Sequence, residues 1–286
     1  MSKIVIIPNN KDNIYNLLNS DNYLLIGIED YSVNTLNISF EEIIELTKKY
    51  NNIFLSMNKN IYNNELEYVE KVLIQIDKLN IKGLFYYDVG ILNIVKRLNL
   101  NINLIWSCEH YTTNYFTINY WYNNGVKSTF LSNEITLNEI EEIIDNTKSS
   151  LFVQLFGYIP MYVSKRHAVK NYLNHFNLDM NSNRYYLFKE DKKYSIIDNK
   201  NGTIIYTNFI LNGLSEYLKI MNKIDYVILN GYDISDDKLN DIISIFKEVN
   251  TDNIDSLNSK IDKMFNNLEK GFLYEETIYR VKKNDR

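Results

Sequence analysis

Short apolar runs alternate along the chain with longer segments whose apolar residues recur at helical spacing. Most of the short runs are almost continuously apolar, which is typical of strands buried on both faces. Eight strands are predicted, at residues 3–8, 22–30, 52–58, 83–90, 103–110, 128–135, 151–157 and 225–231.

Helices are predicted between these strands. Residues 39–50 open with Ser39 followed by Glu42, and residues 136–147 open with Thr136 followed by Glu139. Both pairs have the spacing of a capping box, in which the first side chain and the fourth satisfy each other's backbone N–H groups. The other predicted helices are residues 63–80, 90–98, 113–123 and 235–248.

Repeated strand–helix units in one chain of 286 residues indicate an α/β fold, either a TIM-barrel-like (β/α) barrel or a doubly wound sheet. The barrel is favoured because no glycine-rich phosphate turn follows the first strand. We therefore predict a single barrel-like domain over residues 1–286. A β-rich insertion at about 179–208, with a hairpin turn at Asn201-Gly202, interrupts the alternation. A C-terminal helix and tail occupy about 250–286, with residues 271–281 extended against the barrel wall.

Composition narrows the function classes. The hydrophobic fraction of 45% is enough for a full core, while the net charge of −5 argues against tight nucleic-acid binding by this chain alone. The single cysteine, Cys108, excludes an internal disulfide and a cysteine-only metal site. No apolar run is long enough for a signal peptide or a membrane span, so we expect a cytoplasmic protein without membrane contacts. DNA is not an expected partner either.

In a (β/α) barrel the working face lies at the carboxyl ends of the strands. The candidate catalytic residues at these ends are Asp88, Glu109, His110 and Glu134. Converging carboxylates and an imidazole can perform acid–base chemistry. Carboxylates also follow strands because they cap the next helix, so both roles stay open.

Five further residues are candidates for substrate binding. Lys165 and Arg166 follow a turn at Gly157 and precede a predicted helix start, where they would attract phosphate or carboxylate. A solvated basic first turn is the alternative. The full set of candidate binding residues is Asn58, Asn114, Ser164, Lys165 and Arg166.

The order of several motifs resembles the collagenase-like peptidase family, peptidase family U32. The motifs are Asp88-x-Gly90, the EHYTTN segment at 109–114, Glu134 after a strand, Gly157 followed by Ser164-x-Arg166, NGT at 201–203, and the closing GFLYEETIYRVKK. The resemblance covers nearly the whole chain and extends to the shorter, cysteine-poor members of the family.

The resemblance implies a barrel-like core and two rival activities. Some members are described as peptidases, and others act in the hydroxylation of nucleic-acid bases or of ubiquinone precursors through an iron–sulfur cluster, with prephenate tied to the RNA reactions. Where the family places cysteines, this chain has Pro160 and His167. One thiol cannot hold a cluster that needs about four thiolates. No cofactor or metal is therefore expected in this chain.

The leading hypothesis is a cluster-free subunit in prephenate-dependent hydroxylation of the wobble uridine of tRNA. Its expected partner is a longer, cysteine-bearing paralogue, and tRNA would be reached through the complex. The alternatives are a collagenase-like peptidase that uses the four candidate catalytic residues, and a non-catalytic scaffold barrel.

Overall fold

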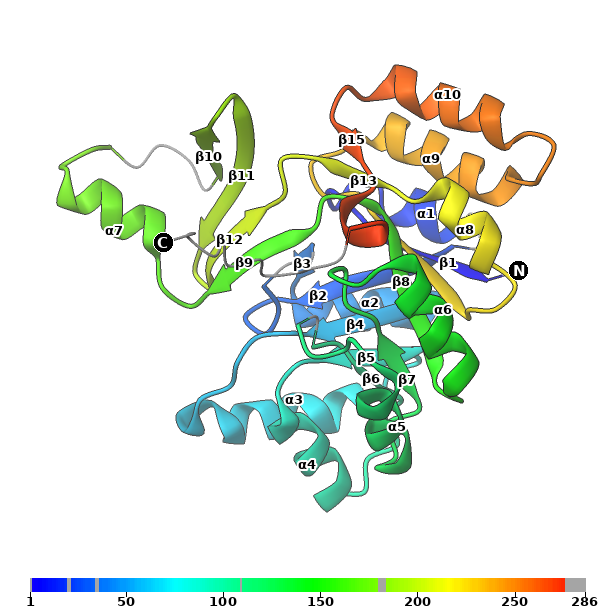
Figure 1. Cartoon of the computed structure of the whole chain (residues 1–286). Coiled ribbons are helices and arrows are strands. Elements are labelled where there is room, and N and C mark those ends of the chain that lie inside the picture. The colour runs from blue at the N-terminus through cyan, green and yellow to red at the C-terminus, as the bar shows by residue number, and fades with distance from the viewer. Residues whose placement is uncertain (1, 20–21, 34–35, 109, 180–183, 276–286) are drawn as a thin grey trace, which may run out of the picture.

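The computed structural model describes residues 2–19, 22–33, 36–108, 110–179 and 184–275 (Figure 1). The strands are β1 (Lys3–Ile7), β2 (Tyr23–Ile28), β3 (Asn37–Ile38), β4 (Ile53–Met57), β5 (Gly83–Tyr86), β6 (Leu104–Trp106), β7 (Ser128–Phe130), β8 (Ser150–Gly157), β9 (Pro160–Ser164), β10 (Arg184–Lys189), β11 (Lys192–Asn199), β12 (Gly202–Tyr206), β13 (Ile210–Asn212), β14 (Tyr226–Asn230) and β15 (Leu268–Glu269).

The α-helices are α1 (Ile14–Asn19), α2 (Phe40–Lys49), α3 (Leu66–Ile76), α4 (Val89–Arg97), α5 (Tyr115–Asn123), α6 (Leu137–Asn146), α7 (Ala168–His175), α8 (Leu214–Ile220), α9 (Asp236–Glu248) and α10 (Ile254–Met264). Two short 3₁₀ turns, η1 (Asn63–Glu65) and η2 (Gly271–Leu273), complete the described elements.

Eight parallel strands close into a barrel (Figure 1). Their order is β1, β2, β4, β5, β6, β7, β8 and β14, and β14 pairs with β8 on one side and β1 on the other. A helix follows each strand of the barrel before the next barrel strand begins. Between β8 and α8 the chain also forms a separate antiparallel sheet and β13. The predicted TIM-barrel-like α/β fold is confirmed.

Aromatic side chains fill the barrel interior. The Phe54 ring makes edge contacts with Phe85 at 5.8 Å and Phe152 at 5.3 Å between centroids, and Tyr226 stacks on Phe152 at 4.2 Å. Aliphatic residues from the other strands, among them Val5 and Ile228, belong to the same buried cluster. The interior is therefore a packed core rather than a pore.

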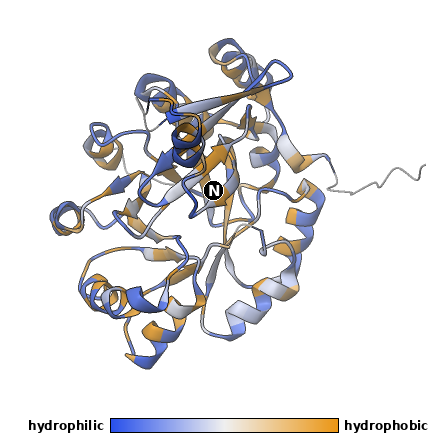
Figure 2. Ribbon diagram, turned by 90° about the vertical axis from the view of Figure 1, so that its left-hand side faces the viewer, coloured by the Kyte–Doolittle hydropathy of each residue, from blue (hydrophilic) through white to orange (hydrophobic). Residues whose placement is uncertain are grey.

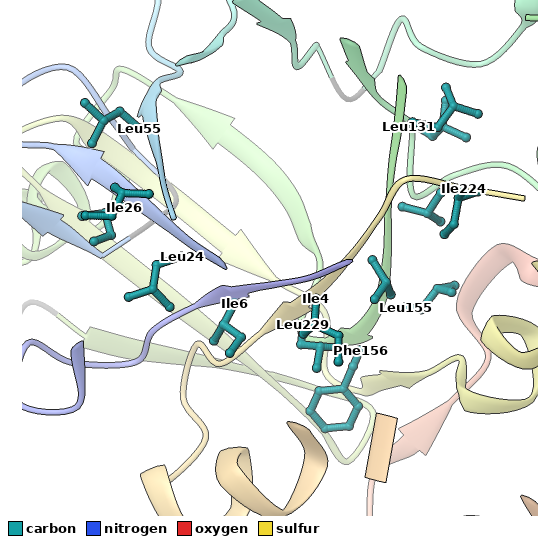
Figure 3. Close-up of a cluster of buried hydrophobic side chains, with 14 of the residues drawn as sticks. Ile4, Ile6, Leu24, Ile26, Leu55, Leu131, Leu155, Phe156, Ile224 and Leu229 are labelled. Atoms are coloured by element: carbon teal, nitrogen blue, oxygen red, sulfur yellow. The ribbon is translucent and has the colours of Figure 1, made fainter. Parts of the chain in front are cut away.

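The opposite faces of the same strands are buried beneath the helices. This outer layer includes Ile4 and Ile6 of β1 and Leu24 and Ile26 of β2 (Figure 3). Figure 2 shows that the central strands are largely apolar. Burial on both faces explains why the strands are almost continuously apolar instead of alternating.

Both predicted capping boxes are confirmed. The Ser39 side chain accepts a hydrogen bond from the Glu42 N–H at the start of α2, and Thr136 does the same for Glu139 at the start of α6. The strand predicted at 128–135 is shorter, because β7 ends at Phe130. The Glu134 N–H then donates to Ser132 Oγ at 3.1 Å, which turns the chain towards α6.

The β-rich insertion begins earlier than the predicted residue 179. Its four-stranded antiparallel sheet has the order β10-β11-β12-β9, so β9 at Pro160 already belongs to it, and α7 lies between β9 and β10. Proline is tolerated as the first residue of a strand, and the MYV that follows it favours a strand. We refer to residues 160–208 as the insertion. The turn at Asn201-Gly202 joins β11 to β12 as predicted.

The described part of the C-terminal tail packs on the barrel. β15 pairs in parallel with β13, and Leu273 is buried. Residues 271–273 form η2 and are not extended as predicted, since Gly271 adopts a positive φ of 53° that turns the chain. Residues 276–286 lie outside the described part.

Within the described residues, no helix combines the length and the apolar character needed to cross a membrane.

The backbone at Gly157 leaves no room for a side chain. An added Cβ would lie 2.1 Å from the Asn230 carbonyl oxygen, and the φ of 105° already disfavours other residues. We expect Gly157→Ala to lower the free energy of unfolding by about 3 kcal/mol or more, from backbone strain and steric overlap together. Gly125→Ala is the matched control, because its φ is 93° but a Cβ there meets nothing within 4 Å. Gly125→Ala should lower the free energy of unfolding by only about 1 kcal/mol, as measured for both variants by urea unfolding. Equal losses would show that the contact with Asn230 is unimportant.

Candidate functional site at the barrel mouth

A cavity of about 320 Å³ lies at the carboxyl ends of the barrel strands, beneath one edge of the insertion. The barrel provides one part of its wall and β9 with the β11–β12 turn the other. The lining residues are Val33, Asn58, Lys59, Asn60, Tyr62, Tyr87, Ser107, His110, Val163, Ser164, Lys165 and Asn201.

Two side chains of the insertion, Asn201 and Lys200, hold it against the barrel beside this cavity. The Asn201 side-chain amide donates to the Ser32 carbonyl oxygen at 2.8 Å. Lys200 Nζ lies 3.0 Å from Glu29 Oε1 and 2.7 Å from Asp30 Oδ1, the two carboxylates that follow β2. The acidic end of β2 therefore anchors the turn of the insertion that closes the cavity.

The floor of the cavity is polar and rests on the aromatic interior. Asn58 and Ser107 line both the cavity and a small void of about 20 Å³ above Phe85 and Phe130. Asn58 Oδ1 accepts hydrogen bonds from Ser32 Oγ at 2.9 Å and from the Val33 N–H at 2.8 Å, which fixes its orientation. A ligand in the cavity would meet oriented polar groups at its base.

Two lysines and one glutamate form the charged wall. Lys59 Nζ lies 2.7 Å from Glu65 Oε1, and Lys165 Nζ lies 3.6 Å from Glu65 Oε2. Lys165 Nζ also lies 3.3 Å from the centroid of the Tyr62 ring, close enough for a cation–π interaction. Two cations share one carboxylate, so this wall keeps a net positive charge that attracts anions.

The pKa of Glu65 is lowered by this arrangement. Partial burial acts to raise the pKa, but the hydrogen bonds from Lys59 and the Tyr62 N–H and the nearby charge of Lys165 outweigh it. The carboxylate is therefore charged over a wider pH range than usual and holds both ammonium groups in place.

His110 and Glu134 come together at the same end of the barrel. His110 Nδ1 lies 3.7 Å from Glu134 Oε1, both side chains are about half exposed, and His110 lines the cavity. A carboxylate next to an imidazole can orient it for proton transfer. Glu109, the third candidate of this group, lies outside the described residues.

Asp88 and Asn114 have capping roles. Asp88 Oδ1 accepts from the Gly90 N–H at 2.8 Å and its Oδ2 from the Ile61 N–H at 3.0 Å, so both oxygens are engaged by backbone. Asn114 Oδ1 accepts from the Thr117 N–H at the start of α5. Neither residue is among those that line the cavity. The structure gives Asp88 the helix-capping role that the sequence left open for it, and it gives a capping role also to Asn114, which was predicted as a binding residue.

The basic segment of the insertion divides between the cavity and the surface. Ser164 and Lys165 line the cavity, whereas Arg166 is exposed outside it. The start of α7 already holds an anion of this chain, because Asp198 Oδ2 accepts from the Val169 and Lys170 N–H groups and Oδ1 lies 3.0 Å from His167 Nδ1. A phosphate would have to displace that carboxylate.

Sequence reasoning missed Lys59, Tyr62 and Glu65. Lys59 directly follows the candidate Asn58 at the end of a strand, which is a usable signal. Tyr62 and Glu65 precede or open a helix and resemble ordinary cap residues, and only their contacts with Lys165, a hundred residues away, give them a place in the site.

An iron–sulfur cluster does not fit these residues. Cys108 is buried in the layer between strands and helices, Pro160 has no ligating atom, and His167 pairs with Asp198. Among the described residues, no three His, Cys, Asp or Glu side chains are grouped as metal ligands. We assign no step of this chain's chemistry to a cluster.

Comparison with known proteins identifies the family. The model of Peptidase family U32 matches residues 20–282, most of the chain. The chain belongs to peptidase family U32. The resemblance drawn from the motifs is therefore confirmed.

Two relatives come from Bacillus subtilis (strain 168). The chain is 22% identical to tRNA hydroxylation protein P2 over 249 residues, which cover 79% of this chain and 81% of that protein. It is 23% identical to tRNA hydroxylation protein P1 over 156 residues, which cover 52% of this chain and 37% of P1.

A solved structure has the same fold. The structure of the U32 peptidase Mk0906 matches with a TM-score of 0.51 and 8% sequence identity, over 80% of this chain and 92% of that one. At this identity the likeness concerns the fold alone.

The charged wall makes stability depend on pH through Glu65. Because the folded pKa is below its ordinary value, the stabilisation is fully present above that ordinary value and is lost as the pH falls through the lowered pKa. We expect the difference in unfolding free energy between wild type and Glu65→Gln to be larger at neutral pH than in acid, as measured by urea unfolding. In a Lys59→Gln background this pH dependence should shrink, since a main cause of the shift is gone. A difference independent of pH would contradict the arrangement.

Proposed function

We propose that this chain is a cluster-free subunit of a tRNA hydroxylation system that acts on wobble uridine and depends on prephenate. The observation that carries the proposal is the similarity to tRNA hydroxylation protein P2. It spans 79% of this chain and 81% of that protein, so the two chains correspond over almost a whole domain rather than over one motif.

The cysteine content supports a partner for the redox chemistry. This chain has one cysteine, which is buried and is not among the residues that line the mouth cavity. Hydroxylation needs an oxidant or an electron carrier, and a cluster requires about four thiolates. The chain is also similar to P1, of which the aligned residues cover only 37%. We propose that a longer, cysteine-bearing paralogue of this kind carries the cluster and pairs with this chain.

The mouth cavity is suited to a small anion. Its volume of about 320 Å³ is at the lower end for small-molecule sites. Lys59 and Lys165 supply two ammonium groups, and prephenate carries two carboxylates. His110, paired with Glu134, is the residue at this mouth best placed to exchange a proton with a ligand. The proposal assigns binding to the lysines and proton transfer to His110.

Peptidase activity is the second candidate, and the family description is its main support. The geometry of the candidate nucleophiles and acids gives peptidase activity little support. Cys108 is buried in the core, and Ser164 Oγ accepts the N–H of Arg166 at 3.1 Å. Asp88 is engaged as a helix cap. The His110–Glu134 pair would remain as its acid–base group.

The proposed function is tested by mass spectrometry of tRNA nucleosides from a strain that lacks the gene. We expect wobble hydroxyuridine and its derivatives to be lost and to return when the wild-type gene is restored. An unchanged profile, in a strain from which the paralogue is also deleted to remove redundancy, would rule the proposal out. Hydrolysis of gelatin by the purified chain would then favour the peptidase.

The same strain tests the mouth cavity. Restoring the gene as Lys59→Ala/Lys165→Ala should give at most about a tenth of the wild-type hydroxyuridine, because two charge-assisted contacts to the anion are lost. Lys78→Ala/Lys96→Ala is the matched control, since both lysines are exposed on the barrel wall. Full restoration by both variants would exclude the lysine pair from the reaction.

A further inference from the structure

Charge is divided unevenly between the barrel and the insertion. Residues 160–208 contain eight basic residues, namely Lys165, Arg166, Lys170, Arg184, Lys189, Lys192, Lys193 and Lys200, and four acidic ones, namely Asp179, Glu190, Asp191 and Asp198. The insertion is therefore +4, and since the whole chain is −5, the remainder is −9. The insertion is therefore basic although the net charge of the whole chain is negative. A local basic region of this kind is typical of a surface that binds a polyanion.

Exposed apolar side chains gather on the same segment. Of the nineteen large hydrophobic residues that are exposed in the described part of the chain, nine lie in the insertion: Met161, Tyr162, Val163, Tyr172, Phe176, Leu178, Tyr186, Leu187 and Phe188. In Figure 1 this segment, with α7 at its far end, projects to one side of the barrel. Exposed apolar side chains concentrated in this way mark a binding surface.

The strand register places aromatic and basic residues on one outer face of the sheet. Directly paired residues of antiparallel strands point to the same side. One row across the four strands is Tyr185, Ile196, Ile205 and Tyr162; the next pairs Leu187 with Tyr194, and the last pairs Lys189 with Lys192.

The opposite face is turned towards the barrel. Its Tyr206 stacks on Tyr232 at 3.9 Å between centroids, and Ile204 belongs to the same buried cluster as Val33. Of the exposed apolar residues, Tyr162 and Leu187 belong to the outer face, whereas Val163, Tyr186 and Phe188 point to the barrel-facing side. The outer face carries no contact with the barrel in these pairs and is the side considered for a partner.

Helix α7 extends this outer face. It starts there, since its N-terminus is bonded to Asp198 and the Ala168 N–H donates to Thr203 Oγ1, and both Asp198 and Thr203 point to the outer side. None of its residues is buried. Tyr172 and Phe176 lie 4.7 Å apart between ring centroids and are more than half exposed. Two adjacent rings that are mostly exposed are a platform on which nucleobases can stack.

Several basic residues of this surface form no salt bridge with another described residue. Arg166, Lys170, Lys189 and Lys192 take part in no salt bridge among the described residues. Lys189 lies directly opposite Lys192, and like charges in that position destabilise a strand pair. The turn between them carries Glu190 and Asp191, and an external polyanion would add to the compensation of the two lysine charges.

We propose that the outer face of the insertion sheet, together with α7, binds single-stranded RNA. Unpaired bases stack on Tyr162, Tyr172 and Phe176, and the phosphates lie along Lys189 and Lys192. Protein interfaces are depleted in lysine, whereas Lys170, Lys189 and Lys192 supply most of the charge of this surface beside Arg166, so the charge favours RNA over a protein partner.

The surface is connected to the mouth cavity through β9. Tyr162 belongs to the outer face, while Val163, Ser164 and Lys165 line the cavity. An RNA loop held on the insertion can thus present one unstacked base to the barrel mouth. In this respect the inference rests on the proposed function, which makes the RNA the anticodon loop of a tRNA.

The test is fluorescence anisotropy of the purified full-length chain with a labelled anticodon stem–loop RNA, between about 50 and 200 mM salt. Lys189→Glu/Lys192→Glu should weaken binding about tenfold and lower the salt slope by about 0.7 per lysine. Tyr172→Ala/Phe176→Ala should weaken binding about tenfold with the salt slope unchanged, because stacking and not charge is removed. All these side chains are exposed, so the fold should survive, as circular dichroism can verify.

Two matched variants on the barrel wall are the controls. Lys78→Glu/Lys96→Glu makes the same charge change, and Tyr68→Ala/Phe116→Ala removes two exposed rings. Both should bind RNA as the wild type does. The inference is overturned if the full-length chain does not bind the stem–loop, if the controls lose as much affinity, or if a fully paired RNA binds as tightly as the loop. It is also overturned if the aromatic variant loses only its association with the paralogue, since the surface would then be a protein interface.

Failure of this inference can be told apart from failure of the proposed function. If hydroxyuridine disappears in the deletion strain and returns fully with the Lys189→Glu/Lys192→Glu gene, the chain acts in the pathway without this RNA surface. If the RNA binds as expected but the tRNA profile never changes, the RNA-binding surface is supported and the role in tRNA hydroxylation is rejected.

Discussion

The structure depends on the seam where β8 meets β14 and closes the barrel. At the carboxyl end of this seam Gly157 lies against the backbone of Asn230 with no space for a side chain. The Tyr158 carbonyl oxygen accepts hydrogen bonds from the side-chain amides of Gln154 at 3.1 Å and Asn230 at 2.9 Å, one from each strand. Closure of the barrel removes the free edges of the sheet and encloses the aromatic interior. The positions of the surrounding helices and of the insertion therefore depend on this pairing of β8 with β14.

The seam also positions the site. The chain leaves the barrel at Gly157 and enters β9 at Pro160, so the insertion starts at the carboxyl end of the strands, the face where barrel enzymes place their chemistry. Lys200 and Asn201 attach the far turn of the insertion to the segment after β2. The cavity is therefore enclosed by two parts of the chain, and neither forms it alone.

The insertion and the barrel are electrostatically distinct, and the mouth lies between them. The barrel carries the acidic excess, the insertion is basic, and Glu65 connects Lys59 of the barrel with Lys165 of the insertion. This division reconciles an acidic protein with a family whose relatives include tRNA hydroxylation proteins. Whole-chain charge describes solubility and long-range attraction, whereas binding is decided by the local arrangement.

The sequence by itself determined the barrel, its strands and the two capping boxes, because hydrophobic periodicity and caps involve residues within a few positions of each other. It also directed attention to Asn58, His110, Glu134, Ser164 and Lys165, which the structure brings to one mouth. Only the tertiary structure decided that Asp88 and Asn114 cap helices, that Asp198 occupies the start of α7, and that Glu65 belongs to the site. A carboxylate after a strand has the same local sequence in either role, and the difference lies in partners that are distant along the chain.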